Sequence, residues 1–159
     1  MKRSGFTMIE LIFVIVILGI LASVAIPKLA ATREDAKISK IDQNVATLVA
    51  DAAAFYTSQG LANWKNNKTV ADVTNVPLST SATAMADAST SKIAPNTGST
   101  DFYINADKDH NCLKVTTTPD GNMTIAKGTD TSGTVCAQVQ KDVASMIKTH
   151  SFGGVSIVR

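Results

Sequence analysis

Hydrophobic residues run almost without interruption from Phe6 to Ile26, which predicts one apolar helix at the start of the chain. At about 1.5 Å of rise per residue, this stretch reaches about 31 Å, enough to cross the hydrocarbon core of a bilayer. The basic pair Lys2-Arg3 precedes it and marks the cytoplasmic side. Glu10 is the exception, because a carboxylate inside a membrane span costs a few kcal/mol and usually has a function.

The hydrophobic pattern changes after Pro27. Apolar residues then recur at spacings of three and four, which predicts an amphipathic helix with one buried stripe: Ile38, Ile41, Val45, Leu48, Ala52 and Phe55. We expect Pro27 to kink the helix without ending it, and Gly60 to cap it, giving one helix over about 6–59. Gly19 weakens the apolar half by roughly 1 kcal/mol relative to alanine, or allows close helix packing.

The distal part of the chain has weaker patterns. Residues 61–100 are loop-like, and we expect Trp64 to anchor the start of this segment on the domain. Alternation and turn residues then predict strands over 101–104, 112–117, 123–126 and 155–158, with a hairpin turn at 119–122 and a short helix over about 137–149.

The stretch Gly5-Phe6-Thr7-Met8-Ile9-Glu10-Leu11, with Gly19 and Pro27 further on, resembles the N-terminus of type IV prepilins and of type II secretion pseudopilins. Met8 stands where this motif usually has leucine. The resemblance implies cleavage between Gly5 and Phe6 by a prepilin peptidase and methylation of the new Phe6 amine. It also implies that Glu10 neutralises the N-terminal ammonium of a neighbouring subunit, and that the helix near Gly19 and Pro27 can lose order on assembly.

The resemblance implies a pilin-like α+β fold, in which the long helix over about 6–59 packs on a small antiparallel sheet beside a short distal helix. It divides the chain into a leader (1–5), a membrane or filament-core helix (6–27), an amphipathic half-helix (28–60) and an extracytoplasmic domain (61–159). The implied location is the bacterial inner membrane as a precursor with a cytoplasmic N-terminus, then a periplasmic or cell-surface filament. The implied partners are further copies of the chain, the peptidase, the membrane and an assembly platform.

Charge and cysteine content add two points. The chain has 15 basic and 13 acidic side chains, and loss of Lys2 and Arg3 with the leader leaves 13 of each, so charge gives no indication of nucleic acid binding. An exported domain meets an oxidising compartment, so Cys112 and Cys136 are expected to form a disulfide that contributes about 3.5 kcal/mol. Two separate buried thiols are the alternative.

Asp107, Asp109 and Asn111 place oxygen atoms at alternate positions, as in a calcium loop. The glycine and glutamate that an EF-hand needs are replaced by Cys112 and Thr118, so the EF-hand interpretation fails. Major pseudopilins, which resemble this chain, bind calcium in a distal loop, and this keeps calcium as a secondary hypothesis beside the expectation of no cofactor. A solvated turn is the simpler interpretation.

Asn122 lies in an Asn-x-Thr glycosylation acceptor with an acidic residue two positions earlier, but hairpin chemistry explains the same residues. Asn67 has the acceptor without the acid. His110 and His150 belong to no recognisable metal or nucleophile spacing, and we expect both at the surface. These residues form no catalytic set, so an enzyme is not expected.

The principal hypothesis is therefore a structural subunit of a pilus-like filament. A pseudopilin of a type II secretion or DNA-uptake system is the alternative within the same class. The hypothesis from a different class is an anchored extracytoplasmic binding protein that never polymerises. Its N-terminus would be uncleaved, with Glu10 present by accident, or would be cleaved as an ordinary secretory signal near residues 22–25.

Overall fold

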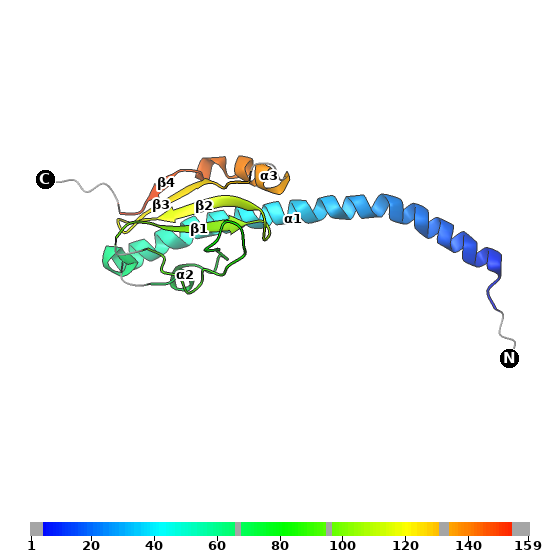
Figure 1. Ribbon diagram of the computed structural model, residues 1–159, viewed down its shortest axis with the longest axis horizontal. Helices are drawn as coiled ribbons and strands as arrows, with labels where there is room; N and C mark the ends of the chain where they lie inside the picture. The colour runs from blue at the N-terminus through cyan, green and yellow to red at the C-terminus, as the bar shows by residue number, and fades with distance from the viewer. Residues whose placement is uncertain (1–4, 66–67, 95–96, 131–133, 154–159) are drawn as a thin grey trace. The chain divides into compact units, whose positions relative to one another are not determined.

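The computed structural model describes residues 5–65, 68–94, 97–130 and 134–153. The chain forms two compact units, one ending at Ala36 and the other beginning at Lys37. The second unit combines helices with a four-stranded sheet (Figure 1). The predicted α+β class, with a long N-terminal helix and a small antiparallel sheet, is confirmed.

The long helix α1 spans Met8–Lys65, and it continues through Pro27 as predicted. Gly60 has φ 71° and ψ 176°, so it interrupts the helical backbone. This conformation suits glycine because a Cβ atom disfavours positive φ. The predicted end of the helix near Gly60 is therefore a break, after which helical turns resume as far as Lys65.

The apolar stripe of α1 supplies one side of the core in the second unit. Ile41, Val45, Leu48 and Ala52 are each at most 5% exposed, as their spacing predicts. They belong to one buried cluster with alternating residues of the sheet, including Phe102, Leu113, Val115, Met123 and Ile125. Burial of this stripe, worth about 1.5–3 kcal/mol for each large aliphatic side chain, holds the helix on the sheet.

The sheet has the order β1-β2-β3-β4, and all its pairings are antiparallel (Figure 1). Its strands are β1 (Thr100–Asn105), β2 (Asn111–Thr117), β3 (Asn122–Lys127) and β4 (Thr149–Ser151). The first three confirm the predicted strands and hairpin. At the hairpin turn, Gly121 has φ 78°, and a Cβ there would lie 2.2 Å from the Tyr56 ring.

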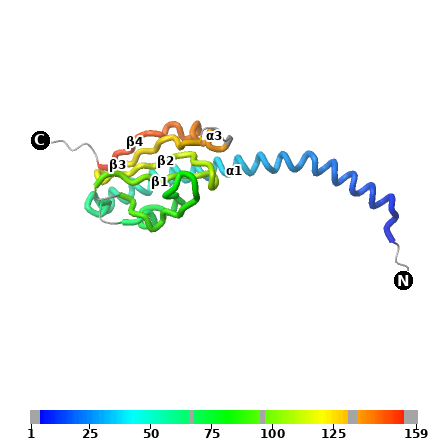
Figure 2. The backbone as a smooth tube through the Cα atoms, in the orientation of Figure 1, coloured from blue at the N-terminus to red at the C-terminus, as the bar shows by residue number. Residues whose placement is uncertain are grey.

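The segment between α1 and β1 contains more structure than the loop that the sequence predicts. The short helix α2 spans Val70–Val73, and further on Ser79 exchanges two backbone hydrogen bonds of 2.8 Å with Tyr103 of β1. Figure 2 shows this segment beside the β1 edge of the sheet. Trp64 anchors its start as predicted, because the buried indole donates to the Thr118 carbonyl at 2.9 Å.

The distal helix is shorter than predicted. Helix α3 spans Thr134–Asp142, and a 3₁₀ turn, η1 (Ala144–Met146), leads into β4, so the predicted helix over 137–149 is wrong beyond Asp142. The predicted disulfide between Cys112 of β2 and Cys136 of α3 is confirmed. Both cysteines are buried, so the bond fixes α3 to the sheet. The predicted strand over 155–158 lies outside the described residues.

Candidate functional site

The first turn of α1 holds Glu10 in a reciprocal set of hydrogen bonds with Thr7. The Thr7 backbone N–H and hydroxyl both donate to Oε2 of Glu10, at 2.8 and 2.7 Å. The Glu10 N–H lies 3.4 Å from the Thr7 hydroxyl oxygen, which accepts from it. Oε1 has no hydrogen-bond partner among the residues that the structure describes. One carboxylate oxygen is thus used within the chain and the other is available.

These contacts are a capping box, in which a Thr before the helix and a Glu three residues later satisfy each other's free N–H groups. Sequence reasoning identified Glu10 but missed Thr7. The spacing Thr7-x-x-Glu10 was a sufficient signal, because it is the capping-box pattern placed directly before an apolar run. The box gives Glu10 a local polar partner, and it fixes the carboxylate at the helix N-terminus, where the helix dipole favours negative charge.

The apolar residues around this cap are exposed. Phe6 is 82% exposed, Ile9 73% and Phe13 67%, and the large hydrophobic side chains from Phe6 to Leu29 are all exposed. By length and composition, α1 contains one stretch that could cross a membrane, and none of that stretch is buried in the structure. Contiguous exposed apolar surface on this scale marks a contact with membrane or protein.

Gly5 and Phe6, the predicted cleavage and methylation residues, precede the first residue of α1 and are exposed. A Cβ on Gly5 would meet no atom within 4 Å among the residues that the structure describes. Phe6 shares a shallow apolar depression with Ile9, Phe13 and Glu10. Processing between Gly5 and Phe6 would create a new amine on Phe6, one of the residues that line this depression with Glu10.

The structure places Gly19 and Pro27 within α1, and a Cβ on Gly19 would also meet open space. Pro27 has no N–H and leaves the carbonyl of Ser23 without its helical donor. The Ser23 hydroxyl donates to the Ile20 carbonyl at 2.7 Å in the same stretch. The helix is continuous here in the free chain, and loss of order on assembly stays a prediction.

Asp107 and Asp109, two of the candidate calcium residues, lie in the turn between β1 and β2 and form ion pairs there, and the third, Asn111, is the first residue of β2. Asp107 Oδ1 is 2.5 Å from Nδ1 of His110, and Nε2 of His110 is 3.6 Å from Oδ2 of Asp130. Asp109 lies 4.0 Å from Lys108 and donates its backbone N–H to Asp107. His110 is exposed as predicted, but it bridges two loops, which the sequence did not reveal.

Asn111, the third candidate, is 1% exposed, and its side-chain nitrogen and oxygen have no hydrogen-bond partner in the described part of the chain. Within the same residues, no group of three or more His, Cys, Asp or Glu side chains is arranged to hold a metal ion. Calcium binding at this turn therefore stays a prediction, and the observed geometry uses Asp107 as the partner of a histidine.

The glycosylation candidate Asn122 is half-buried at the start of β3, where it pairs with Ser151 of β4. Its backbone carbonyl accepts from the Thr118 N–H at 2.9 Å across the hairpin. Its role in the turn is thus visible, and modification stays a prediction. Asn67 lies outside the described residues. His150 is half-buried, with Nε2 3.0 Å from the carbonyl oxygen of Met146.

The fold and the N-terminal cap define the class: a pilin-like α+β protein with an exposed apolar helix that carries a capped glutamate. Comparison with known proteins points the same way. Residues 1–26 match the family model described as the prokaryotic N-terminal methylation motif. The chain is also 40% identical over 67 residues to the type II secretion system core protein G of Aeromonas hydrophila.

That match covers 42% of this chain and 42% of the length of the relative. No solved structure matches the chain. The motif, the relative and the fold together support the type IV pilin and pseudopilin family for this chain. This family is a structural one and not a class of enzymes.

Proposed function

We propose that this chain is a structural subunit of a type IV pilus-like filament. It is made as an inner-membrane prepilin with a cytoplasmic N-terminus, cleaved after Gly5 and methylated at Phe6. The observation that carries the proposal is the Glu10 carboxylate held at the tip of an exposed apolar helix. An ordinary anchor needs the hydrophobic surface but has no use for a fixed acid within it.

The apolar surface from Phe6 to Ile26 supports assembly because it is compatible with two environments. In the bilayer it contacts lipid, and in a filament it contacts the same helix of other copies, so transfer costs little hydrophobic free energy. Since association of apolar helices is weakly directional, polar groups must set the alignment. A Glu10 carboxylate facing the Phe6 amine of a neighbouring copy meets this need, because misalignment leaves both charges buried without a partner.

The capping box supports a specific state of Glu10 before assembly. With Oε2 bonded to Thr7, the carboxylate is partly satisfied within one chain, and this lowers the cost of holding it near the membrane. Oε1 remains for the amine of the next copy. Both contacts can be made at once, because a carboxylate accepts several hydrogen bonds through its two oxygens.

A second candidate function within the same class is a pseudopilin of a secretion system. The observation that favours it is the name of the relative, a type II secretion system core protein. The two candidates share the N-terminal mechanism and differ in what the filament does. Electron microscopy of long surface filaments would favour the pilus, whereas loss of protein secretion in a deletion strain would favour the pseudopilus.

Replacing Glu10 tests the proposal. In the native host, Glu10→Ala is expected to leave membrane insertion intact, while sheared filaments fall by about two orders of magnitude, as for an unpaired buried amine costing about 3 kcal/mol. Glu34→Ala is the matched control, since it removes the same side chain from the same helix beyond the apolar run. Filament yield equal to wild type in Glu10→Ala would overturn the register role.

N-terminal sequencing separates the proposal from a non-polymerising anchored protein. The mature chain is expected to begin at methylated Phe6. A chain that still carries residues 1–5, or one that begins near residue 26 after conventional cleavage, would contradict the prepilin assignment. The sequencing uses membrane-extracted full-length protein, so it does not depend on filament formation.

A further inference from the structure

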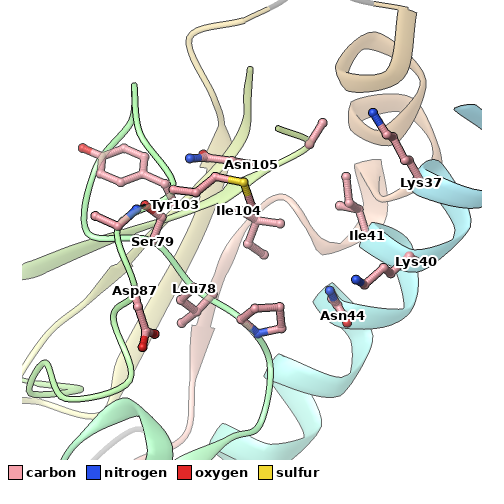
Figure 3. Close-up of a pocket in the computed structure, with 14 residues that line it drawn as sticks. Lys37, Lys40, Ile41, Asn44, Leu78, Ser79, Asp87, Tyr103, Ile104 and Asn105 are labelled. Atoms are coloured by element: carbon pink, nitrogen blue, oxygen red, sulfur yellow. Dashed lines mark hydrogen bonds between the residues drawn. The ribbon is translucent and has the colours of Figure 1, made fainter. Parts of the chain in front are cut away.

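A pocket of about 470 Å³ lies in the second unit between α1 and the segment that leads into β1 (Figure 3). This volume falls in the range of sites that bind small organic ligands. Ile41 lines it from α1, Leu78 from the segment before β1, and Ile104 from β1, and each is at most 5% exposed. Met85 also lines it and is 67% exposed, and its flexible thioether can adapt to the shape of a ligand.

On the side of the pocket that faces α1, the polar groups are already used within the chain. The Ser79 hydroxyl and the Asn105 amide both donate to the carbonyls of Ser81 and Ala84, at 2.7 to 3.2 Å. The Asp87 carboxylate accepts from the N–H and the hydroxyl of the serine two residues further on, at 2.9 and 2.8 Å. This side therefore offers a ligand mainly apolar surface.

The α1 side of the pocket carries three donor groups (Figure 3). At about 100° per residue, Lys37, Lys40 and Asn44 lie within about 60° of one another around the helix. Among the residues that the structure describes, neither lysine makes a salt bridge within 4 Å and the Asn44 side chain makes no hydrogen bond. Lys37 acts at longer range on Asp107, which is already paired with His110.

The pocket therefore has two chemically different walls, and this restricts the ligand. A small polar metabolite would place its polar groups against Leu78 and Ile104, where they would lose their hydration without a new partner. A peptide would bring backbone groups to the same apolar wall. A ligand with an anionic group at one end and an aliphatic body at the other suits both walls, because the charge meets the lysines and the body meets the core.

We propose that this pocket binds a single-chain amphipathic anion, a carboxylate or a phosphate ester on an aliphatic chain. The anionic group accepts hydrogen bonds from Lys37, Lys40 and the Asn44 amide, and the aliphatic chain lies against Leu78 and Ile104. All these residues belong to one copy of the chain. Binding of this ligand thus goes beyond the proposed function and does not depend on filament formation.

Photo-crosslinking in a bilayer tests the proposal. The full chain is placed in nanodiscs of a zwitterionic lipid and irradiated with a decanoic acid that carries a diazirine at the end of its chain. Cleavage after lysine separates two peptides that line the pocket, residues 69–92 and 93–108, from the apolar span. We expect saturable labelling of both peptides, which unlabelled decanoate displaces. Labelling of the span should rise linearly with the probe, because it reports partition into lipid.

The charge of the probe and of the lysine wall supplies the controls. The methyl ester of the probe should label the span equally and the pocket peptides about tenfold less. Lys37→Gln with Lys40→Gln should raise the half-saturating concentration of the acid about tenfold, because two charged donors are lost. Lys141→Gln with Lys148→Gln is the matched control, since it removes two exposed lysines outside the pocket lining and should change nothing.

Reversing the charge of the wall gives a gain of binding. Lys37→Glu with Lys40→Glu should lose saturable labelling by the acid and acquire it for the corresponding diazirine decylamine, a result that unfolding cannot produce. A decyl phosphate probe run beside the acid identifies the preferred head group, and saturable labelling by either supports the proposal. Pocket labelling that is equal for the acid and its ester, or absent with both anionic probes, would overturn it. Filament yield does not enter this measurement, so that outcome would leave the proposed function standing.

Discussion

The two stretches of α1 on either side of Ala36 have the same secondary structure but place their hydrophobic residues in opposite environments. Leu18 is 58% exposed, whereas Leu48 is 0% exposed. In the second stretch the apolar stripe meets a sheet of the same chain, and in the first stretch the apolar residues surround the helix and meet nothing. A helix that is hydrophobic on all sides is built for surroundings that its own chain does not supply.

The first stretch of α1 and the second unit also differ in the hydrogen bonds that their polar side chains make. In the first stretch, the Glu10 carboxylate is held by one neighbouring residue, Thr7. In the second unit, polar groups tie distant segments together, as Trp64 does to Thr118 and Gln140 to the carbonyl of Cys112. Substitutions in the first stretch should therefore change processing and assembly, and substitutions in the second unit should change stability.

The largest expected effect is at the processing bond. Gly5→Val places a branched side chain at the residue before the cut, and we expect complete loss of cleavage with the domain still folded. Intact-mass measurement of membrane-extracted protein should find residues 1–5 retained. Gly19→Val makes the same substitution inside the apolar run, where the structure is also open, and should be processed normally. Cleavage of Gly5→Val would show that the bond is assigned wrongly.

The next effect tests the two environments of α1 directly. Leu48→Ala leaves a cavity in the core and should lower the free energy of unfolding of the second unit by about 2–5 kcal/mol. Leu18→Ala removes the same atoms from an exposed position and should leave that free energy unchanged. The single tryptophan, Trp64, is buried in the second unit, so its fluorescence during denaturation in detergent reports this unit. Equal losses in both variants would contradict the comparison.

A loss of comparable size is expected on removing the disulfide. Cys112→Ala with Cys136→Ala should lower the free energy of unfolding by about 3.5 kcal/mol, because the bond closes a loop with a sequence separation of 24. The same tryptophan measurement applies, and reduced wild-type protein is the control that separates loss of the bond from loss of sulfur packing. Membrane insertion and cleavage after Gly5 should not change. A defect in cleavage after Gly5 in this variant would contradict the expectation that the disulfide affects only the stability of the second unit.

The sequence predicts much of this division, and the errors have identifiable causes. Both halves of α1 and strands β1 to β3 follow from the periodicity of hydrophobic residues. Helix α2 and strand β4 have four and three residues, too few to show a period. The predicted distal helix was too long because Met146 and Ile147 lie at helical spacing from Val143. In the structure these residues form the 3₁₀ turn η1 or follow it, and the next element, β4, pairs with β3.

The candidate site shows the same limit. Gly5, Phe6 and Glu10 are neighbours in the sequence, so a local motif reveals them. The bridge from His110 to Asp130 joins the turn before β2 to the segment after β3, and only the antiparallel pairing of those strands brings the two together. No spacing rule gives that contact.

The smallest expected effect concerns this bridge and depends on pH. The hydrogen bond from His110 to Asp107, then the Asp107 charge, raises the pKa of His110. Burial opposes ionisation of Asp107, but the hydrogen bonds from His110 and from the Asp109 N–H prevail and lower its pKa. The pair therefore stabilises the fold fully below the ordinary histidine pKa of about 6.5 and above the ordinary aspartate pKa of about 3.9.

His110→Gln keeps a donor at this position but removes the charge. We expect its melting temperature to lie below that of wild type between about pH 4 and pH 6.5, where both partners are ionised. The difference should shrink as the pH rises through the raised histidine pKa, because the wild type then loses the same charge. His150→Gln is the matched control, since His150 contacts a backbone carbonyl. A melting-temperature difference that is constant with pH would show that His110 acts through packing and not through charge.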